Sequence, residues 1–203
     1  MPRYLMTHSL LSSWLYAMRE NPYEDATSER DAFEEFKQVL RREPTETTDA
    51  MIKGINFENL VTDIIGGCAD TTDKWYESAE KVANIIKGGK LQFRASKEIT
   101  VKGFTLVLYG RLDALKAGVI YDIKFSGSYD VGKYFSSTQH PTYFEIVPEA
   151  DEFTYLVSNG SAVWPETYRR DEAQDIKQII SDFLDFLEAQ GLMEIYKEKW
   201  VAK

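Results

Sequence analysis

The chain has 203 residues, of which 43% are hydrophobic and 28% are charged, the balance of an ordinary globular protein. This length suits one domain with a sizeable core, so we treat residues 1–203 as a single domain. The lone cysteine, Cys68, excludes an internal disulfide, and the two histidines, His8 and His140, are too few for the usual structural zinc cage.

The sequence shows no signal for export or membrane insertion. No apolar run is long enough to span a bilayer, and residues 1–18 are interrupted by polar side chains and lack a small-residue cleavage site. We therefore expect a protein of the reducing cytoplasm that has no membrane partner.

The first half of the chain has the patterns of helices. Four segments combine helical apolar spacing with start or stop signals, at residues 9–18, 28–43, 47–67 and 72–87. In the second of these, Ser28 and Asp31 are spaced as a capping box, and Pro44 ends the helix. Gly66 and Gly67 close the third helix.

The second half combines strands with helices. Three strands are predicted at 90–101, 104–116 and 119–125, then a short helix at 137–147, strands at 152–159 and 161–168, and a long amphipathic helix at 171–191. This order predicts an α/β (α+β) fold in which the three strands form an antiparallel meander. We divide the chain into an N-terminal helical part (1–47), a core (48–147) and C-terminal strands with a helix (148–203).

The hairpin between the second and third strands carries an unusual set of charges. A two-residue turn at 117–118 predicts a register in which Asp113 faces Asp122 and Arg111 faces Lys124. Like charges that are directly opposed across two strands are destabilising. Because strand residues alternate between faces, Asp122 and Lys124 also share one face.

This arrangement indicates that a cation lies between the carboxylates. A solvated sheet face is the alternative, but it gives no reason to oppose like charges. Mg²⁺ is held by one or two carboxylates together with water and substrate phosphates. Asp113 and Asp122 therefore form a candidate site for Mg²⁺ or Mn²⁺, with Lys124 beside it.

Basic residues are concentrated on the same strands. Between Lys87 and Lys133 the net charge is +5, although the whole chain carries −9 and the remainder therefore −14. Because phosphate binding depends on Lys and Arg, Arg94, Lys97, Arg111 and Lys133 are candidate contacts to DNA. Chance clustering on a solvated face is the alternative.

The stretch from Gly110 to Lys124 resembles a known family. Its "GRLD" and "DIK" match the G-x-x-D…(D/E)-x-K core of the PD-(D/E)XK nuclease superfamily, specifically its RecB-like exonuclease branch. Two further pieces match in the family's order. Glu58 in "GINFENLV" corresponds to an upstream helical carboxylate, and Gln139 and Tyr143 in "QHPTY" correspond to a Q-x-x-x-Y helix motif.

The resemblance implies a restriction-endonuclease-like core, with a central mixed sheet flanked by helices. It implies metal-dependent hydrolysis of phosphodiester bonds in DNA that has a free end, in bacterial or phage recombination or repair. The expected compartment is then the cytoplasm of a bacterial or phage-infected cell, and a recombination or annealing protein is a partner to consider. The oligomeric state stays open.

The resemblance also assigns roles to the metal site. Asp113 and Asp122 would hold Mg²⁺ or Mn²⁺, with Glu58 and the carbonyl group of Ile123 as further ligands. Lys124 would orient the attacking water or stabilise the charged transition state.

Gln139 and Tyr143 would hold the DNA end or a water network. Pro141 between them requires that this helix begin near Thr138 or Gln139. Cys68 alone cannot hold the iron–sulfur cluster that some relatives carry. Two other interpretations stay open: a catalytically inactive DNA-binding protein of the same fold, and an acidic phage-type interaction or inhibitor protein.

Overall fold

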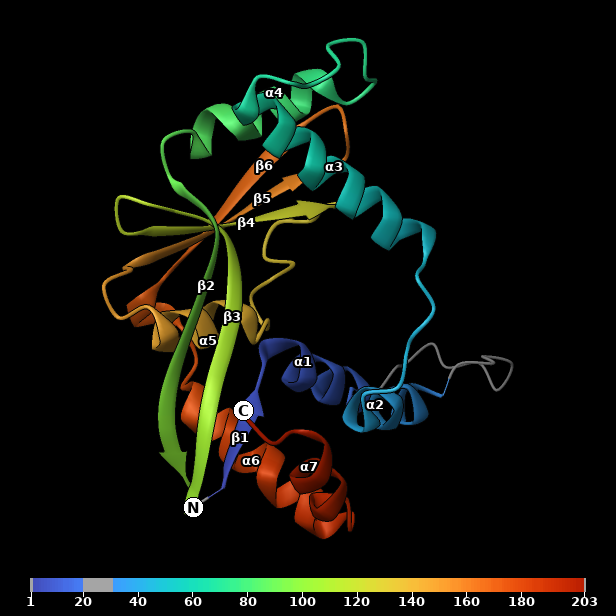
Figure 1. Ribbon diagram of the computed structural model, residues 1–203, viewed down its shortest axis with the longest axis vertical. Coiled ribbons are helices and arrows are strands. Elements are labelled where there is room, and N and C mark those ends of the chain that lie inside the picture. The colour runs from blue at the N-terminus through green and yellow to red at the C-terminus, as the bar shows by residue number, and fades with distance from the viewer. Residues whose placement is uncertain (1, 20–30, 203) are drawn as a thin grey trace.

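The computed structural model describes residues 2–19 and 31–202, which contain seven α-helices and six β-strands (Figure 1). In chain order the elements are β1 Arg3–Met6, α1 His8–Ala17, α2 Ala32–Arg41, α3 Asp49–Gly66, α4 Tyr76–Ile86, β2 Lys90–Val101, β3 Phe104–Lys116, β4 Val119–Phe125, α5 Gln139–Ile146, β5 Glu152–Ser158, β6 Val163–Arg169, α6 Ile176–Ala189 and α7 Met193–Lys199. A single 3₁₀ turn, Arg170–Glu172, follows β6.

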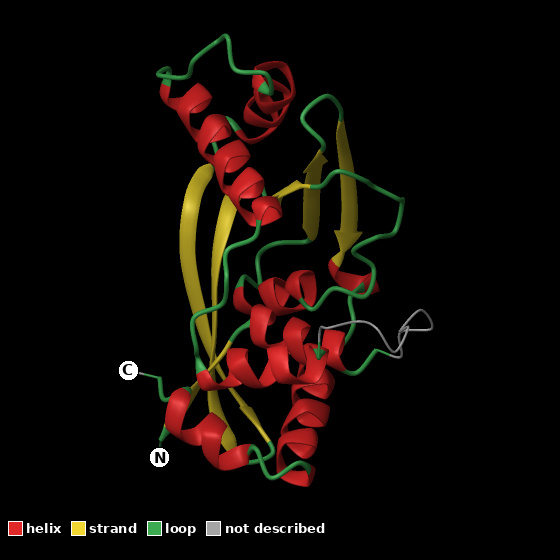
Figure 2. Cartoon of the chain, turned by 90° about the vertical axis from the view of Figure 1, so that its right-hand side faces the viewer, coloured by secondary structure: helices red, strands yellow, loops and turns green. Residues whose placement is uncertain are grey.

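All six strands belong to one mixed sheet. β3 pairs antiparallel with β2 and β4 and parallel with β1, while β5 pairs parallel with β4 and antiparallel with β6. Figure 2 shows the long β2–β3 ribbon along one side of the molecule, with helices packed in front of it. The predicted α/β (α+β) class, a central mixed sheet with an antiparallel meander and flanking helices, is confirmed.

The strongest local patterns give the most accurate bounds. β2, β3 and β4 have the predicted limits. α3 begins after Thr48, whose side chain accepts a hydrogen bond from the N–H of Met51, and it ends at Gly66 with Gly67 in the left-handed conformation.

Other elements differ from the prediction at their ends. α4 and α6 begin several residues later than predicted. Ser28 of the predicted capping box lies outside the described residues, whereas Asp31 caps α2 by accepting from the N–H groups of Phe33 and Glu34. β1 and α7 were not predicted, because four and seven residues are too few for a periodic pattern to emerge.

The turn between β3 and β4 is the predicted one. Ala117 and Gly118 both adopt positive φ, 51° and 80°, as a two-residue hairpin turn with the right-handed twist of its strands requires. The register is also as predicted, with Leu115 opposite Ile120.

The ladder is shorter than predicted, however. The expectation that Asp113 and Asp122 form an opposed ladder pair, and that Arg111 opposes Lys124, is wrong, because pairing with β3 stops at Tyr121. Along its other edge, β4 pairs over its whole length with β5, while the β3 edge is left unpaired beyond Tyr121.

This divergence leaves a gap on one edge of β3. β2 occupies the other edge, while β1 pairs with residues 105–108 and β4 with residues 114–116. α5 closes part of the gap. The hydroxyl of Tyr143 donates to the carbonyl of Arg111 (3.0 Å), a backbone group to which a strand would otherwise bind.

The hydrophobic core lies on both faces of the sheet. Along β5, Phe153 and Tyr155 point into the larger cluster, which α1, α2, α5 and α6 cover, and Leu156 points into a smaller cluster under α3 and α4. None of the helices in the described ranges is both long and apolar enough to cross a membrane.

Gly110 allows α5 to approach β3 closely. A Cβ atom at this position would lie 1.8 Å from Cε1 of Tyr143. We expect Gly110→Ala to displace the Tyr143 ring and to lower the free energy of unfolding by about 1–3 kcal/mol, the usual effect of overpacking. For a chain of this length that is a fall in Tm of a few to about 10 °C, measurable by thermal melting.

Gly54→Ala is the matched control, because a Cβ there meets nothing within 4 Å and the position is inside a helix. Alanine should stabilise α3 by about 0.5–1 kcal/mol. Equal melting shifts for the two variants would contradict the proposed contact between Gly110 and Tyr143.

Candidate active site

Asp122 and Lys124 lie on one face of β4 where it leaves β3. Asp122 is 6% exposed, and Nζ of Lys124 is 2.8 Å from its Oδ2. The side-chain amide of Gln139 donates to its Oδ1. Burial disfavours the charged form of Lys124, but the Asp122 carboxylate outweighs burial and raises the pKa of Lys124 above its ordinary value.

Asp113 lies beside this ion pair. Its Oδ2 accepts a hydrogen bond from the N–H of Ile123 (2.7 Å), so a side chain takes the place of the missing ladder bond. Burial and the negative charges of Asp122 and Glu58 raise the pKa of Asp113 to about 8. The carboxyl groups therefore interact as predicted, although their backbones are not paired.

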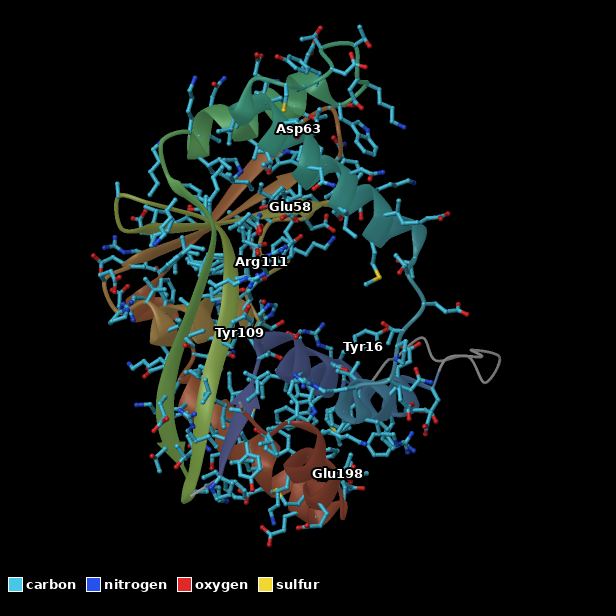
Figure 3. All side chains as sticks on the ribbon, viewed as in Figure 1. Tyr16, Glu58, Asp63, Tyr109, Arg111 and Glu198 are labelled. Carbon is cyan, nitrogen blue, oxygen red and sulfur yellow. The ribbon has the colours of Figure 1, made fainter. Side chains whose placement is uncertain are left out.

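Glu58 reaches the same region from α3. Its Oε1 accepts a hydrogen bond from Nε2 of Gln92 (2.7 Å) and lies 3.6 Å from Nη2 of Arg111. Figure 3 shows Glu58 and Arg111 on the facing sides of α3 and the sheet. Glu58 thus points from α3 toward β2 and β3, and its side chain is 26% exposed.

α5 carries Gln139 and Tyr143 to the opened edge of the sheet. The helix begins at Gln139, which places Pro141 in its first turn, where a missing N–H has no intrahelical partner to lose. Gln139 is buried and binds Asp122, while Tyr143 binds the backbone of β3. Burial raises the pKa of Tyr143, so its hydroxyl remains a neutral donor.

The arrangement fits a divalent cation in two respects. Oδ2 of Asp122 is buried and accepts no well-aligned hydrogen bond from the described residues, although Lys124 lies close to it. The N–H of Ile123 points toward Asp113, and in a strand the carbonyl of the same residue projects to the same edge. Asp113, Asp122 and the carbonyl of Ile123 are therefore oxygen donors on one side of the gap.

The fourth predicted ligand lies apart from these three donors. Among residues 2–19 and 31–202, no group of three His, Cys, Asp or Glu side chains is arranged to hold a metal ion. Glu58 is engaged by Gln92 and Arg111.

The predicted DNA-binding residues fall into three settings. Arg94 and Arg111 stand opposite each other on β2 and β3, and both are exposed. Lys97 is paired with Glu145 of α5 (2.7 Å), which neutralises its charge. Lys133 is exposed in the segment between β4 and α5.

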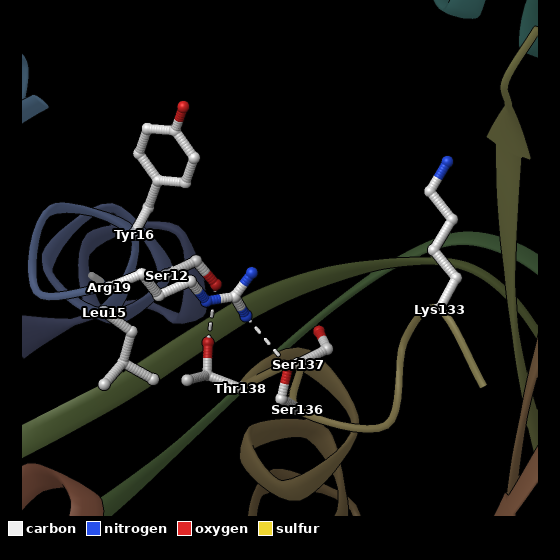
Figure 4. Close-up of a pocket in the computed structure, with 8 residues that line it drawn as sticks. All are labelled: Ser12, Leu15, Tyr16, Arg19, Lys133, Ser136, Ser137 and Thr138. Atoms are coloured by element: carbon white, nitrogen blue, oxygen red, sulfur yellow. Dashed lines mark hydrogen bonds between the residues drawn. The ribbon is translucent and has the colours of Figure 1, made fainter. Parts of the chain in front are cut away.

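Lys133 lines a polar pocket of about 310 Å³ (Figure 4). Arg19 lines it from the end of α1 and donates to the hydroxyl of Ser136 (2.8 Å). Thr138, which directly precedes Gln139, completes one wall of the pocket. None of the described residues that line the pocket is acidic. The pocket is therefore a cationic, hydroxyl-rich hollow next to the carboxylate cluster.

Sequence reasoning missed Arg19, Gln92 and His8. The ring of His8 lies 5.5 Å from that of Tyr143, and burial lowers the pKa of His8 to about 4 against the opposing charge of Asp122. No local pattern distinguishes these residues, since they come from elements far apart in the chain. The run of hydroxyl residues in "SSTQ" before α5 could have pointed to the pocket that Arg19 lines, although not to Arg19 itself.

The comparisons with known proteins bear on the fold. No family model matches the chain, and no curated protein matches it. The chain is similar to the solved structure titled "Crystal structure of SSO0001", with a TM-score of 0.50 and 14% sequence identity over 92% of this chain and 77% of that chain. At this identity the similarity shows a common architecture and nothing further.

Proposed function

We propose that this protein is a metal-dependent DNA exonuclease of the RecB-like branch of the PD-(D/E)XK nuclease superfamily. The cluster of Asp113, Asp122 and Lys124 carries the proposal, because burial and the neighbouring carboxylates raise the pKa of Asp113 to about 8 and the amine of Lys124 lies 2.8 Å from Asp122. Gln139 of α5 supports it by binding Asp122, and Glu58 of α3 supports it because its negative charge contributes to the raised pKa of Asp113.

Each side chain then has a distinct part in hydrolysis. A divalent cation held by Asp113 and Asp122 would supply an activated water and offset the charge on the phosphoryl oxygens. The amine of Lys124, 2.8 Å from Oδ2 of Asp122, would orient that water or stabilise the negative charge that builds up in the transition state. Gln139 keeps Asp122 in one rotamer, and Tyr143 keeps the β3 backbone in place beside it.

The surroundings of the cluster suit a phosphate backbone. The pocket of Arg19 and Lys133 joins two cations with hydroxyl donors and is lined by no acidic side chain among the described residues. Arg111 and Arg94 extend the positive charge along the sheet. Contacts of this kind bind DNA without reading its sequence, as an exonuclease requires.

The proposed function is tested with end-labelled linear DNA and covalently closed circular DNA, each in Mg²⁺, Mn²⁺ or EDTA. We expect linear DNA to be degraded with either metal, circular DNA to resist, and EDTA to stop the reaction. Equal cleavage of circular DNA would remove the exonuclease part of the proposal. DNA binding without hydrolysis would indicate an inactive DNA-binding protein. The absence of both binding and hydrolysis would indicate an acidic interaction protein.

We expect Arg19→Ala and Lys133→Ala each to weaken DNA binding by a factor that does not depend on the DNA sequence. Each should also reduce the slope of log affinity against log salt concentration by about one, because one phosphate contact is lost. Fluorescence anisotropy in EDTA at several salt concentrations measures this. Lys102→Ala, at the distant β2–β3 turn, is the matched control, and an equal change of slope in all three variants would argue against a phosphate site in the pocket.

A further inference from the structure

A second cavity, of about 670 Å³, lies at the end of β4. Its walls come from the start of α3, the residues before α4, the end of β4 and the turn after β5. Two of its residues are aromatic, Trp75 and Phe125, two are exposed lysines, Lys53 and Lys74, and one is acidic, Asp49. This combination of flat apolar rings with cations differs from the hydroxyl-rich pocket of Arg19 and Lys133.

The aromatic wall is held rigidly. The ring centroids of Trp75 and Phe125 are 4.6 Å apart, and Phe57 of the core packs against both. Gly160, with φ of +92°, lets the turn after β5 approach the indole, since a Cβ there would lie 2.4 Å from Cδ1 of Trp75. The ring of Trp75 is thus fixed before any ligand binds, so little conformational entropy is lost on stacking.

The polar groups around this wall suit a planar heterocycle. Oδ1 of Asn159 accepts from the N–H groups of Ser161 and Ala162 (3.0 Å each), which fixes the amide. Its Nδ2 donors have no hydrogen-bond partner among the residues that the structure describes. Nζ of Lys74 lies over the Trp75 ring, 4.6 Å from its centroid, where it can also meet a phosphate.

The cavity lies at the end of β4, one residue along the chain from Lys124. Phe125 directly follows Lys124 in β4, and alternation places the two side chains on opposite faces of the strand. A DNA strand with a phosphate beside Lys124 would have to pass round the end of β4 for a base to reach Phe125 and Trp75.

We infer that this cavity binds an unpaired nucleobase of the DNA strand, stacked on Trp75 and Phe125. The inference rests on the proposed function and deepens it, because a base can enter only when it is not paired. The substrate held at the carboxylate cluster is then a single strand or a frayed duplex end. Stacking on aromatic rings serves every base, in keeping with binding that ignores sequence.

The test is a binding measurement in EDTA, so that no hydrolysis occurs. The probes are a short oligothymidylate and an abasic oligomer of equal length, and the readouts are anisotropy and tryptophan fluorescence. We expect oligothymidylate to quench the fluorescence of the wild-type protein and the abasic oligomer to leave it unchanged. Trp75→Leu should weaken oligothymidylate binding about 5- to 150-fold, the range that one stacking contact covers, and should leave abasic binding unchanged.

Three further measurements keep the result interpretable. Trp164→Phe removes an indole that stacks on Tyr129 outside the cavity, so quenching should persist in this variant. If Trp75→Leu fails to fold, Trp75→Phe retains a ring and should abolish only the quenching. The pair Lys53→Ser and Asn159→Ala leaves the aromatic wall intact and should weaken the binding of oligothymidylate.

Equal quenching by both oligomers, or quenching that survives Trp75→Phe, would overturn the inference. The outcome is separable from that of the proposed function. A protein that degrades DNA but shows no base-dependent quenching keeps the nuclease proposal and loses the nucleobase site. One that shows the quenching without hydrolysis keeps the site and loses the nuclease proposal.

Discussion

Replacing Asp113, Asp122 or Lys124 with alanine should lower the rate of DNA hydrolysis by orders of magnitude. For Lys124→Ala the expected fall is about 100- to 1000-fold, because a positioned donor to developing charge typically contributes that much. Asp113→Ala and Asp122→Ala each remove an oxygen donor from the proposed cation site. Excess metal should not restore the rate of hydrolysis in either variant. The measurement is the initial rate on end-labelled linear DNA.

The controls for these rates come from the same structure. Lys102→Ala changes the same residue type at a distant turn and should keep the wild-type rate. Gln139→Ala should be milder than Asp122→Ala, because Gln139 positions a carboxylate without being a proposed ligand. Wild-type rates in Asp113→Ala, Asp122→Ala and Lys124→Ala, all folded by circular dichroism, would refute the site assignment.

The metal-free protein should be destabilised by the repulsion between Asp113 and Asp122, and a bound cation should relieve it. We expect wild type to melt higher in millimolar Mn²⁺ than in EDTA. A ligand at a hundred times its Kd adds about 2.7 kcal/mol, which corresponds to about 5–11 °C here. Asp113→Asn removes the repulsion and weakens the site, so it should melt as high as wild type or higher in EDTA and gain little from metal.

Wild type and Asp113→Asn should also differ in how their stability depends on pH. The pKa of Asp113 is about 8 in the folded protein, above the ordinary value of 3.8. Its contribution to stability is therefore complete below the unfolded pKa and is lost as pH rises through the folded one. Between pH 5 and 8 in EDTA, wild type should lose on the order of 3 kcal/mol relative to Asp113→Asn, since each pKa unit corresponds to about 1.4 kcal/mol.

Thermal melts of both proteins in EDTA and in Mn²⁺, at pH 5 and pH 8, make this measurement. Asp171→Asn, at a position 81% exposed, is the matched control and should keep the wild-type responses to metal and to pH. Metal shifts of the same size in wild type and Asp113→Asn would mean that Asp113 does not hold the ion. A melting difference that does not change with pH would contradict the raised pKa.

Local sequence patterns determined much of this fold. The 117–118 turn needs only two residues with positive φ between two strand-like runs, so the hairpin and its register could be predicted. The capping residue Thr48 and the closing Gly67 likewise determined the ends of α3. Turn, cap and alternation depend on neighbours in the chain, and their energies are therefore available from a short stretch of sequence.

Tertiary pairing decided how the candidate site is built. The sequence predicted Asp113 opposite Asp122, but β4 leaves β3 after Tyr121 while its other edge stays paired with β5, and this opens the edge of β3. The gap then requires partners from elsewhere, which Tyr143 and Gln139 of α5 supply. The point at which two paired strands separate depends on elements distant in the chain and has no signature in either strand alone.

The charges show the same division. The sequence determined that basic residues gather between Lys87 and Lys133, whereas only the tertiary structure paired Lys97 with Glu145 and brought Arg19 next to Lys133. It also placed Trp75 against Phe125. Composition is a sum along the chain, but a binding site depends on which side chains meet in space, and the packing of the whole sheet and its helices decides those meetings.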